Sequence, residues 1–482
     1  MLSPYFRRLA TLLYLLSLST LSYANNIVLP DIGDNAGAIS PAEEYRTGEA
    51  VIRSIRHAGG ILDDPLIQEY LNELGYRIVA SSETQQPFHF FLIKDDSINA
   101  FALPGGFIGI NAGLILATNS ESELAGVMAH EIAHVTQRHH ARRYEQGSNS
   151  LPIFAAIIAA IVLGQKDSNI GNAALASTLG GTAQNQINFT RANEKEADRI
   201  GIELLINAEF NPHGMPDFFE TLDKKSRNYG NNIPEFLRTH PVTPSRISDS
   251  KHRASRYPNK LSIDSIAYHL LRTRIEVLSS HDNAKLLSKY DNELKQGSYQ
   301  NQNAARYGYT LALVANKKYA QAQKQVKILL KKNPEQITFN ILKAQVETEA
   351  KQYPAAIKTF QNLLKIYPGN KTVNLFYAQT LLKANKLKAA QRVLQTQIAQ
   401  DTKIPETYRL LAETQAKLND PINSHHSLAE YYYLLGQTHE AIKQLEIALK
   451  VPKINFYLTN RIEARLKEFK NETLQLSDNE KH

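Results

Sequence analysis

Cysteine is absent from this 482-residue sequence. Its absence excludes disulfide bonds, thiolate metal sites, a cysteine nucleophile and a lipidated N-terminal cysteine. A large exported protein without cysteine suits a compartment in which thiols are prone to oxidation, such as a bacterial periplasm. Any catalytic or metal-binding group must therefore be another residue type.

Long apolar runs are also absent after the N-terminus. Arg7 and Arg8 precede an apolar run over residues 9–21, which is followed by small residues that end at Ala24. This order is typical of a cleaved secretory signal peptide, so we predict a signal peptide over residues 1–24 and export to the periplasm. No later segment reaches the roughly 20 apolar residues that a membrane span needs. We therefore expect no membrane span.

Residues 151–163 form an uncharged apolar stretch that is too short to cross a bilayer. Two interpretations fit it: a buried helix, or a mobile apolar flap near a cleft that can touch unfolded substrate or lipid. The second interpretation would allow peripheral contact with a membrane.

Positive charge is concentrated in the C-terminal part of the chain. The whole sequence has a net charge of +8, whereas the residues from Asn301 onward contain 27 Lys and Arg against 15 Asp and Glu. No base-stacking or groove-reading motif accompanies this charge, so we expect no binding of nucleic acid. A basic helical surface instead favours acidic protein or membrane surfaces.

The length of the chain predicts more than one domain. Residues 25–260 contain all of the candidate catalytic and metal-binding motifs, and we interpret them as one α+β domain. Residues 261–300 have the pattern of a helical connector. Residues 301–475 are built from repeats.

Small residues recur every 34 positions in the C-terminal part. Such residues let two antiparallel helices approach closely, and proline ends the second helix of a pair. This pattern resembles the tetratricopeptide family over residues 303–450, with a further pair around Gly436 half a unit out of phase. It implies a curved solenoid whose concave face binds proteins or peptides. The columns in register are Ala322, Ala356 and Ala390, and also Thr310, Ala344, Ala378 and Ala412.

The strongest chemical signal is the sequence from His130 to His134, which reads His-Glu-Ile-Ala-His. On a helix, His130 and His134 lie about 40° apart around the axis, so both imidazoles can bind one metal ion. Glu131 lies about 100° from His130, beside the metal, where it can accept a proton from the attacking water. We predict His130 and His134 as metal ligands and Glu131 as the catalytic base.

A second helix-like segment carries Glu194 and Asp198, again four residues apart. A catalytic zinc site commonly has two His and one Glu, so Glu194 is the predicted third ligand of one Zn²⁺ per subunit. Asp198 is predicted to be catalytic, either by holding the second nitrogen of a liganding histidine or by assisting proton transfer. Glu196 is interpreted as a surface charge. His139 and His140 lie outside the four-residue spacing and are interpreted as solvent-facing.

These motifs and the sequence Asn-Ala-Phe-Ala-Leu-Pro-Gly-Gly at residues 99–106 resemble gluzincin metallopeptidases related to the CAAX-prenyl and stress-response membrane proteases. With the repeats and the signal peptide, the resemblance covers nearly the whole mature chain. It implies an α+β zincin-type metallopeptidase domain followed by an all-α tetratricopeptide-type solenoid. It also implies a periplasmic branch whose members degrade or assist misassembled outer-membrane proteins near the barrel-assembly machinery. These partners come from the resemblance alone.

Two strands are expected before the metal helix, at residues 88–93 and 107–110, with a Pro-Gly-Gly turn between them. A strand beside the metal helix can bind substrate by adding an extended peptide to its edge. A hairpin that only packs is the alternative. The candidate substrate-binding residues are Asn99, Ala100, Phe101 and Ala102.

Residues 239–246 contain two prolines and paired hydroxyls, which predict an ordered loop. The resemblance implies that this loop covers the active site and that His240 is a fourth metal ligand, which silences the enzyme until it is displaced. The residues alone also fit an ordinary loop histidine. Arg246 is a candidate for steadying a substrate carbonyl or the developing oxyanion.

The sequence thus predicts a zinc-dependent metalloendopeptidase that cleaves misfolded or misassembled proteins, with repeats that bind substrates or partners and add chaperone-like activity. The alternative is a non-proteolytic chaperone or adaptor in which the repeats act and the metal site is structural. Glu131 argues against this alternative, because a site without catalysis needs no base.

Overall fold

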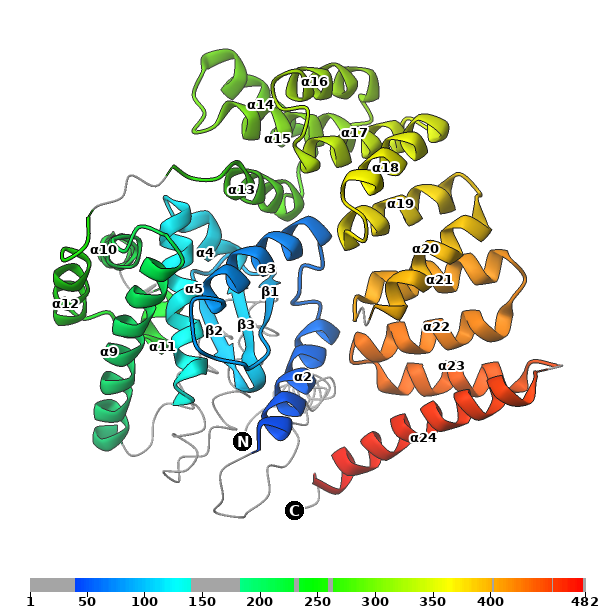
Figure 1. The fold of residues 1–482 in the computed structure, drawn as a ribbon, viewed down its shortest axis with the longest axis horizontal. Coiled ribbons are helices and arrows are strands. Elements are labelled where there is room, and N and C mark those ends of the chain that lie inside the picture. Colours follow the sequence, from blue (N-terminus) through cyan, green and yellow to red (C-terminus); the bar gives the residue numbers. More distant parts are fainter. Residues whose placement is uncertain are drawn as a thin grey trace, which may run out of the picture.

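The computed structural model describes residues 40–139, 183–228, 234–258, 263–400, 403–452 and 454–479. Figure 1 shows two parts, a mixed α/β part and an arch of paired helices beside it. The predicted signal peptide, His140 and residues 151–163 lie outside the described ranges. Within those ranges, no helix combines the length and the apolarity that a membrane crossing requires.

A three-stranded sheet with the order β1-β3-β2 lies in the first part. β1 (His89–Ile93) runs parallel to β3 (Phe107–Asn111), whereas β2 (Ala100–Leu103) runs antiparallel to β3. The Pro-Gly-Gly turn (η1, Pro104–Gly106) joins β2 to β3, so a direct turn between the two predicted strands was wrong. The sequence did not reveal β2, because all four of its residues are buried and the polar alternation of a half-exposed strand is missing.

The two faces of the sheet pack against different helices. Phe91 and Phe101 pack with α2 (Pro41–His57), whereas Phe90 and Ala102 belong to the larger core with α3 (Pro65–Val79) and α5 (Glu121–Thr136). The tight turn that precedes β3 requires glycine, because Gly105 has a φ of 75° and a Cβ there would lie 2.5 Å from the Cα of Tyr45 on α2. The helices α2 and α3 thus enclose the strands that lead toward α5.

α5 (Glu121–Thr136) and α9 (Ala183–Asn207) pack against each other in the core of the first part. A Cβ at Gly201 on α9 would lie 3.2 Å from the backbone nitrogen of His130, so glycine permits the close approach of the two helices. Gly126 has the same role toward the backbone of Met215, from which its Cβ would be 2.9 Å away. Both glycines thus permit close packing of other helices against α5 near His130.

Four further helices lie in this part among the described residues. Together they place a buried aromatic group, which includes Phe218 and Phe236, beneath the loop at residues 240–243. In chain order they are α4 (Ala112–Ala117), α10 (Gly214–Asn228), α11 (Glu235–Thr239) and α12 (Pro244–Ala254).

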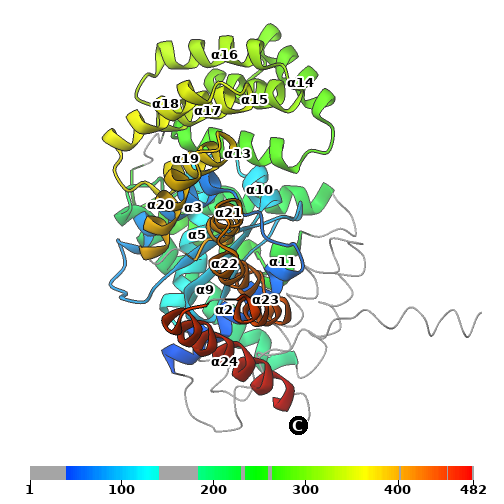
Figure 2. The ribbon, with the colours of Figure 1, turned by 90° about the vertical axis from the view of Figure 1, so that its right-hand side faces the viewer.

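In the second part, the described residues from 263 to 479 form helices and their connections, and these are stacked in an arch (Figures 1 and 2). The helices are α13 (Ile266–Ser279), α14 (Asn283–Gln296), α15 (Gln302–Ala315), α16 (Tyr319–Lys332), α17 (Ile337–Glu349), α18 (Tyr353–Ile366), α19 (Lys371–Lys383), α20 (Leu387–Ala399), α21 (Pro405–Lys417), α22 (Pro421–Leu434), α23 (Thr438–Lys450) and α24 (Phe456–Asn479).

The predicted 34-residue repeat is confirmed by this stack of helices. Ala322, Ala356 and Ala390 are fully buried, as close packing of paired helices requires. The turn inside each pair has the same period, but the sequence did not mark it, since the residues in the left-handed conformation there are not glycine. They are Lys317, Lys351, Asn385 and Asn419.

The predicted helical connector forms α13 and α14, and it joins the two parts through buried polar contacts. Arg274 on α13 donates to both oxygens of Asp64, each at 2.6 Å, and also to the hydroxyl of Tyr307 at 3.0 Å. Asp64 in turn caps the N-terminus of α3. The connector therefore ties the start of the solenoid to a helix that packs against the sheet.

The far end of the solenoid returns to the first part at α2, as Figure 1 shows. Arg53 on α2 forms an ion pair with Glu472 on α24, and its guanidinium lies 4.3 Å from the ring centre of Tyr433 on α22. Gly436 permits this contact, because a Cβ there would lie 2.5 Å from the carbonyl oxygen of Arg53. The solenoid is thus held to the first part at both of its ends.

Candidate metal centre

α5 carries three of the predicted site residues into the core. Ser120 caps the helix by accepting a hydrogen bond from the backbone N–H of Glu123. The exposed fractions of His130, Glu131 and His134 are 0, 1 and 6%. Burial of three titratable side chains destabilises the fold unless each has a polar partner or binds a metal. The groups around them therefore indicate their function.

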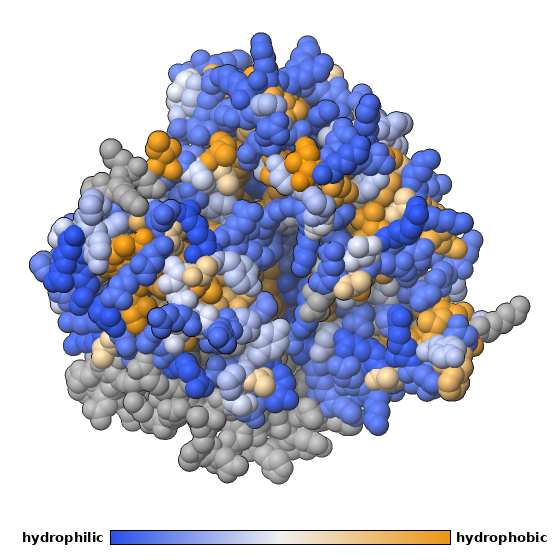
Figure 3. Space-filling model, in the orientation of Figure 1, coloured by the Kyte–Doolittle hydropathy of each residue, from blue (hydrophilic) through white to orange (hydrophobic). Residues whose placement is uncertain are grey.

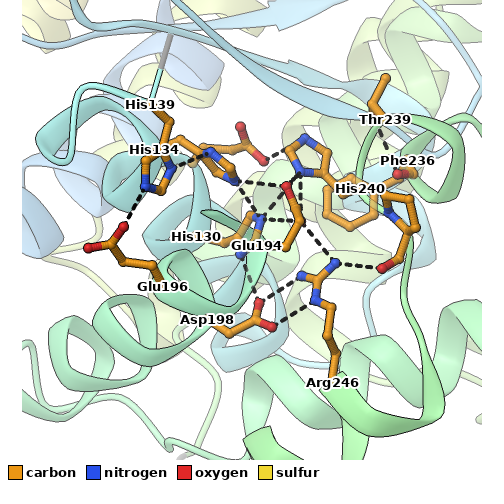
Figure 4. Close-up of polar contacts among 12 residues, drawn as sticks. His130, His134, His139, Glu194, Glu196, Asp198, Phe236, Thr239, His240 and Arg246 are labelled. Atoms are coloured by element: carbon orange, nitrogen blue, oxygen red, sulfur yellow. Dashed lines mark hydrogen bonds and ion pairs between the residues drawn. The ribbon is translucent and has the colours of Figure 1, made fainter. Parts of the chain in front are cut away.

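α9 brings Glu194 against both imidazoles (Figure 4). The Nε2 atoms of His130 and His134 lie 3.1 Å apart, and each lies 3.3 Å from an oxygen of Glu194. His240 approaches from the loop, with its Nδ1 3.3 Å from Nε2 of His130 and 3.1 Å from Oε1 of Glu194. One ligand atom from each of these four residues lies within 4.8 Å of all the others.

These separations fit a zinc ion better than they fit hydrogen bonds. Four atoms about 2 Å from a tetrahedral zinc ion lie roughly 3.3 Å apart. A ring nitrogen of histidine offers either one proton or one lone pair, so Nε2 of His130 cannot satisfy His134, Glu194 and His240 together. Two His and one Glu form a common catalytic zinc site, and His240 adds a ligand of the same chemistry.

The surroundings shift the pKa values of the two histidines of α5 in opposite directions. Burial opposes the charge on His130, but hydrogen bonds to Asp198 and Glu194 outweigh burial and raise the pKa of His130 to about 9. Burial lowers the pKa of His134 well below its ordinary value. His134 therefore offers a neutral ring to a metal, whereas a metal must compete with a proton at His130.

Asp198 and Arg246 hold the other side of His130. Oδ1 of Asp198 lies 3.1 Å from Nδ1 of His130, which leaves Nε2 directed at Glu194. Arg246 donates to both oxygens of Asp198, at 2.7 and 2.8 Å, and pairs with Glu194 at 2.9 Å. Burial would raise the pKa of both carboxyls, but His240 and Arg246 hold the pKa of Glu194 well below its ordinary value, and Arg246 and His130 lower that of Asp198. Both groups are therefore carboxylates.

The structure gives Arg246 other partners than the expected substrate carbonyl. Its residue lies in the first turn of α12, capped by Thr243, rather than in a loop. The side chain is 3% exposed, donates a 2.8 Å hydrogen bond to the carbonyl oxygen of Pro241, and lies 5.1 Å from the ring centre of Phe219. Arg246 thus neutralises the two carboxylates behind the site and anchors the loop that carries His240.

His240 is the most exposed member of the four-residue cluster, with a side chain that is 12% accessible. Its backbone N–H donates to Phe236 at 2.7 Å, and its ring stacks on that of Phe236 with centres 4.8 Å apart. Its Nε2 lies 3.5 Å from Oε1 of Glu131. The ring therefore stands between the predicted base and the predicted metal ligands.

The predicted substrate-binding segment lies beside α5. β2 packs against α5 and is an edge strand of the described sheet, paired with β3 on one side. Asn99, Ala100, Phe101 and Ala102 are buried as whole residues, backbone included, with exposed fractions between 0 and 4%. An extended peptide can therefore pair with the backbone of this edge only after the groups that cover it move aside.

His139 and Glu196 are site residues that the sequence interpretation missed. His139 was predicted to face solvent, but it is 3% exposed and its Nδ1 lies 2.9 Å from Nδ1 of His134. Glu196 was interpreted as a surface charge and is 33% exposed, and its Oε2 also lies 3.1 Å from Nε2 of His139. The four-residue spacing argument failed here because His139 follows the end of the helix, where that spacing no longer applies.

Comparison with known families supports this organisation. Residues 65–254 match Peptidase family M48, and residues 311–371 and 347–418 match tetratricopeptide repeats. The resemblance to zinc metallopeptidases with C-terminal repeats is therefore confirmed, as is the predicted order of a zincin-type domain and a helical solenoid.

Three relatives illustrate the similarity. The "Beta-barrel assembly-enhancing protease" of Yersinia pestis is 39% identical over 66% of this chain and 66% of that protein. The protein of the same name from Escherichia coli is 39% identical over 64% of this chain and 63% of its own length. The "Mitochondrial metalloendopeptidase OMA1" of Schizosaccharomyces pombe is 31% identical over 37% of this chain and 50% of that protein. The matched region thus spans just under two thirds of the first two relatives.

Proposed function

We propose that this chain, whose residues 65–254 form a domain of peptidase family M48, is a zinc-dependent metalloendopeptidase. The observation that carries the proposal is the convergence of His130, His134 and Glu194 at tetrahedral separations, with Glu131 beside them. A zinc ion held by these ligands would polarise the carbonyl of the scissile peptide bond and make water more acidic.

Glu131 is the group that moves the proton. Its carboxylate is buried, and among the described residues neither of its oxygens has a hydrogen-bond partner. A buried carboxylate without hydrogen bonds destabilises the fold. The same lack of partners leaves its oxygens available to accept a proton from water. After the attack, the same carboxyl group can pass that proton to the leaving amine. Asp198 contributes by holding Nδ1 of His130, so that Nε2 keeps its direction.

The backbone edge of β2 is the proposed place for the substrate. An extended peptide added to this edge would lie beside α5, because β2 packs against that helix. Residues 99–102 are buried as whole residues, so they would contribute backbone hydrogen bonds only once the edge is uncovered. This mode of binding favours unfolded segments of many sequences.

His240 is proposed as the fourth ligand of a resting, silenced enzyme. Its Nδ1 lies 3.3 Å from Nε2 of His130 and 3.1 Å from Oε1 of Glu194, and its Nε2 lies 3.5 Å from Glu131. One ring would therefore take the open position of the metal and block the base. The loop that carries it is anchored by Arg246 and Phe236. Displacement of the loop by substrate would free both groups together.

His240→Ala is therefore expected to raise basal cleavage, including self-cleavage. If His240 is bound in about nine of ten resting molecules, the increase is about tenfold. Zinc content should change little because three ligands remain. The measurement is the rate of self-cleavage of the purified protein over time, with Glu131→Gln/His240→Ala as the inactive control and His252→Ala, an exposed histidine on α12, as the matched control. Equal or slower self-cleavage in His240→Ala would exclude the silencing role.

The location and the partners are part of the same proposal. We propose a periplasmic enzyme that acts on misfolded or misassembled outer-membrane proteins near the barrel-assembly machinery. The names of the two bacterial relatives support the link to beta-barrel assembly, and the predicted signal peptide supports the location. The solenoid would bind these proteins and could protect them without cleavage. Figure 3 shows a hollow between the solenoid and the first part, on a mostly hydrophilic surface. The excess of Lys and Arg after Asn301 favours acidic partners there.

Removal of the metal tests whether cleavage depends on zinc. We expect a chelator to abolish cleavage of an unfolded protein substrate, and stoichiometric zinc to restore it, because Glu131 alone cannot activate the carbonyl. Metal content by elemental analysis and cleavage by gel electrophoresis are measured on the same samples. Full activity in protein shown to contain no metal would contradict a zinc peptidase.

A further inference from the structure

The chain reverses direction at the end of α5 and brings His139 back against His134 of the same helix. Gln137 ends the helix, and the next residue, Arg138, has a left-handed conformation with a φ of 51°. The N–H of Arg138 donates to the carbonyl oxygen of Val135 at 2.9 Å, which is one of the two hydrogen bonds of a Schellman turn. In such a turn, the residue after the left-handed one lies against the residue five positions earlier. Here those two residues are His139 and His134.

The ring of His139 lies between His134 and Glu196, as Figure 4 shows. Nδ1 of His139 is 2.9 Å from Nδ1 of His134, and Nε2 of His139 is 3.1 Å from Oε2 of Glu196. Both histidines are buried, whereas the side chain of Glu196 is 33% exposed. The contacts therefore run from the metal site to a carboxylate at the surface.

One arrangement of protons satisfies these contacts while His134 binds a metal through Nε2. A neutral His134 with its Nε2 lone pair directed at the metal carries its proton on Nδ1. That N–H donates to Nδ1 of His139, so the proton of His139 is on Nε2 and is donated to the carboxylate of Glu196. The opposite tautomer of His139 would place two N–H groups against each other at 2.9 Å.

We propose that His139 and Glu196 are positioning residues, which fix the ring and the tautomer of His134 for metal binding. The inference rests on the proposed zinc site. It gives His134 a support equivalent to the one that Asp198 gives His130, but with an additional histidine between the ligand and the carboxylate. α9 thus provides one metal ligand and the carboxylates behind both histidine ligands. Partners of this kind commonly raise metal affinity 10- to 100-fold, roughly.

A matched pair of substitutions at His139 separates positioning from packing. Asn and Leu have similar shapes, but only Asn can place an oxygen near the position of Nδ1 and accept from His134. We expect His139→Leu to weaken zinc binding by roughly 10- to 100-fold and His139→Asn to recover most of that loss. Affinity is measured on the full chain by competition with a fluorescent zinc chelator at neutral pH. The melting temperature of each metal-free variant is measured in parallel.

A second pair tests the carboxylate at a partly exposed position, where folding is not at risk. Glu196→Ala should weaken zinc binding by about tenfold, and Glu196→Gln by less, since the amide oxygen can still accept from His139. Glu203→Ala, an exposed change on the same helix, should leave the affinity unchanged. Wild-type affinity in both His139→Leu and Glu196→Ala would overturn the inference, as would equal weakening by His139→Leu and His139→Asn. A wild-type protein that binds no zinc would instead overturn the proposed function.

Discussion

Glu131→Gln protein is expected to keep its fold and its zinc while losing cleavage of an unfolded substrate by about 10²- to 10⁴-fold. Glutamine has nearly the same shape as glutamate, so the buried position is refilled without a cavity. The substitution removes no ligand, because the four ligand atoms belong to His130, His134, Glu194 and His240. It removes the one carboxylate beside them whose oxygens have no hydrogen-bond partner among the described residues.

The matched control for this loss is Glu203→Gln, which makes the same chemical change at an exposed position on α9. Initial rates on a reduced, unfolded protein and the zinc content of the same preparations give the two readouts. Substantial residual cleavage by Glu131→Gln, with its zinc content intact, would show that another group accepts the proton. Loss of zinc together with activity would instead place Glu131 among the ligands.

Glu194→Gln is expected to lower zinc affinity by more than the roughly 100-fold that the loss of a supporting residue causes, because it removes a ligand itself. The carboxylate of Glu194 lies 3.3 Å from Nε2 of both His130 and His134, and 3.1 Å from Nδ1 of His240. A neutral amide cannot provide a negative oxygen between these nitrogens. The purified variant should therefore contain far less than one zinc per chain.

Competition with a fluorescent chelator gives the affinity of Glu194→Gln, and elemental analysis gives its zinc content as purified. His134→Ala is the companion variant, since it removes another ligand and should show a loss of the same order. A Glu194→Gln protein with the full wild-type zinc content would mean that the metal lies elsewhere. Circular dichroism of each variant shows whether the helices persist.

Helical periodicity allowed much of the site to be anticipated from the sequence. His130 and His134 on one helix and Glu194 and Asp198 on another are pairs with a spacing of four residues, which places both members on one face. The structure brings the two pairs together, with Asp198 against Nδ1 of His130. Their catalytic roles stay predictions until the variants are measured.

Features that depend on chain reversals were not predictable in the same way. β2 was missed because both of its faces are covered, and His139 was misinterpreted because Arg138 adopts a left-handed turn that its residue type does not favour. Arg246 was expected to face a substrate, but its partners Asp198 and Glu194 lie far from it in sequence. Contacts between residues so distant in sequence cannot be predicted from the pattern of one segment.

The sequence by itself determined the class of ligands, the two helices that carry them, and the repeat of the solenoid, because each is a periodic pattern within one segment. Only the tertiary structure decided which charges neutralise one another, where His240 lies, and how α2 and α13 hold the solenoid at both ends. These contacts join segments that are distant along the chain, so their geometry follows from the packing of whole elements. The same packing places His139 and Glu196 behind His134, a support that no pattern in the sequence indicated.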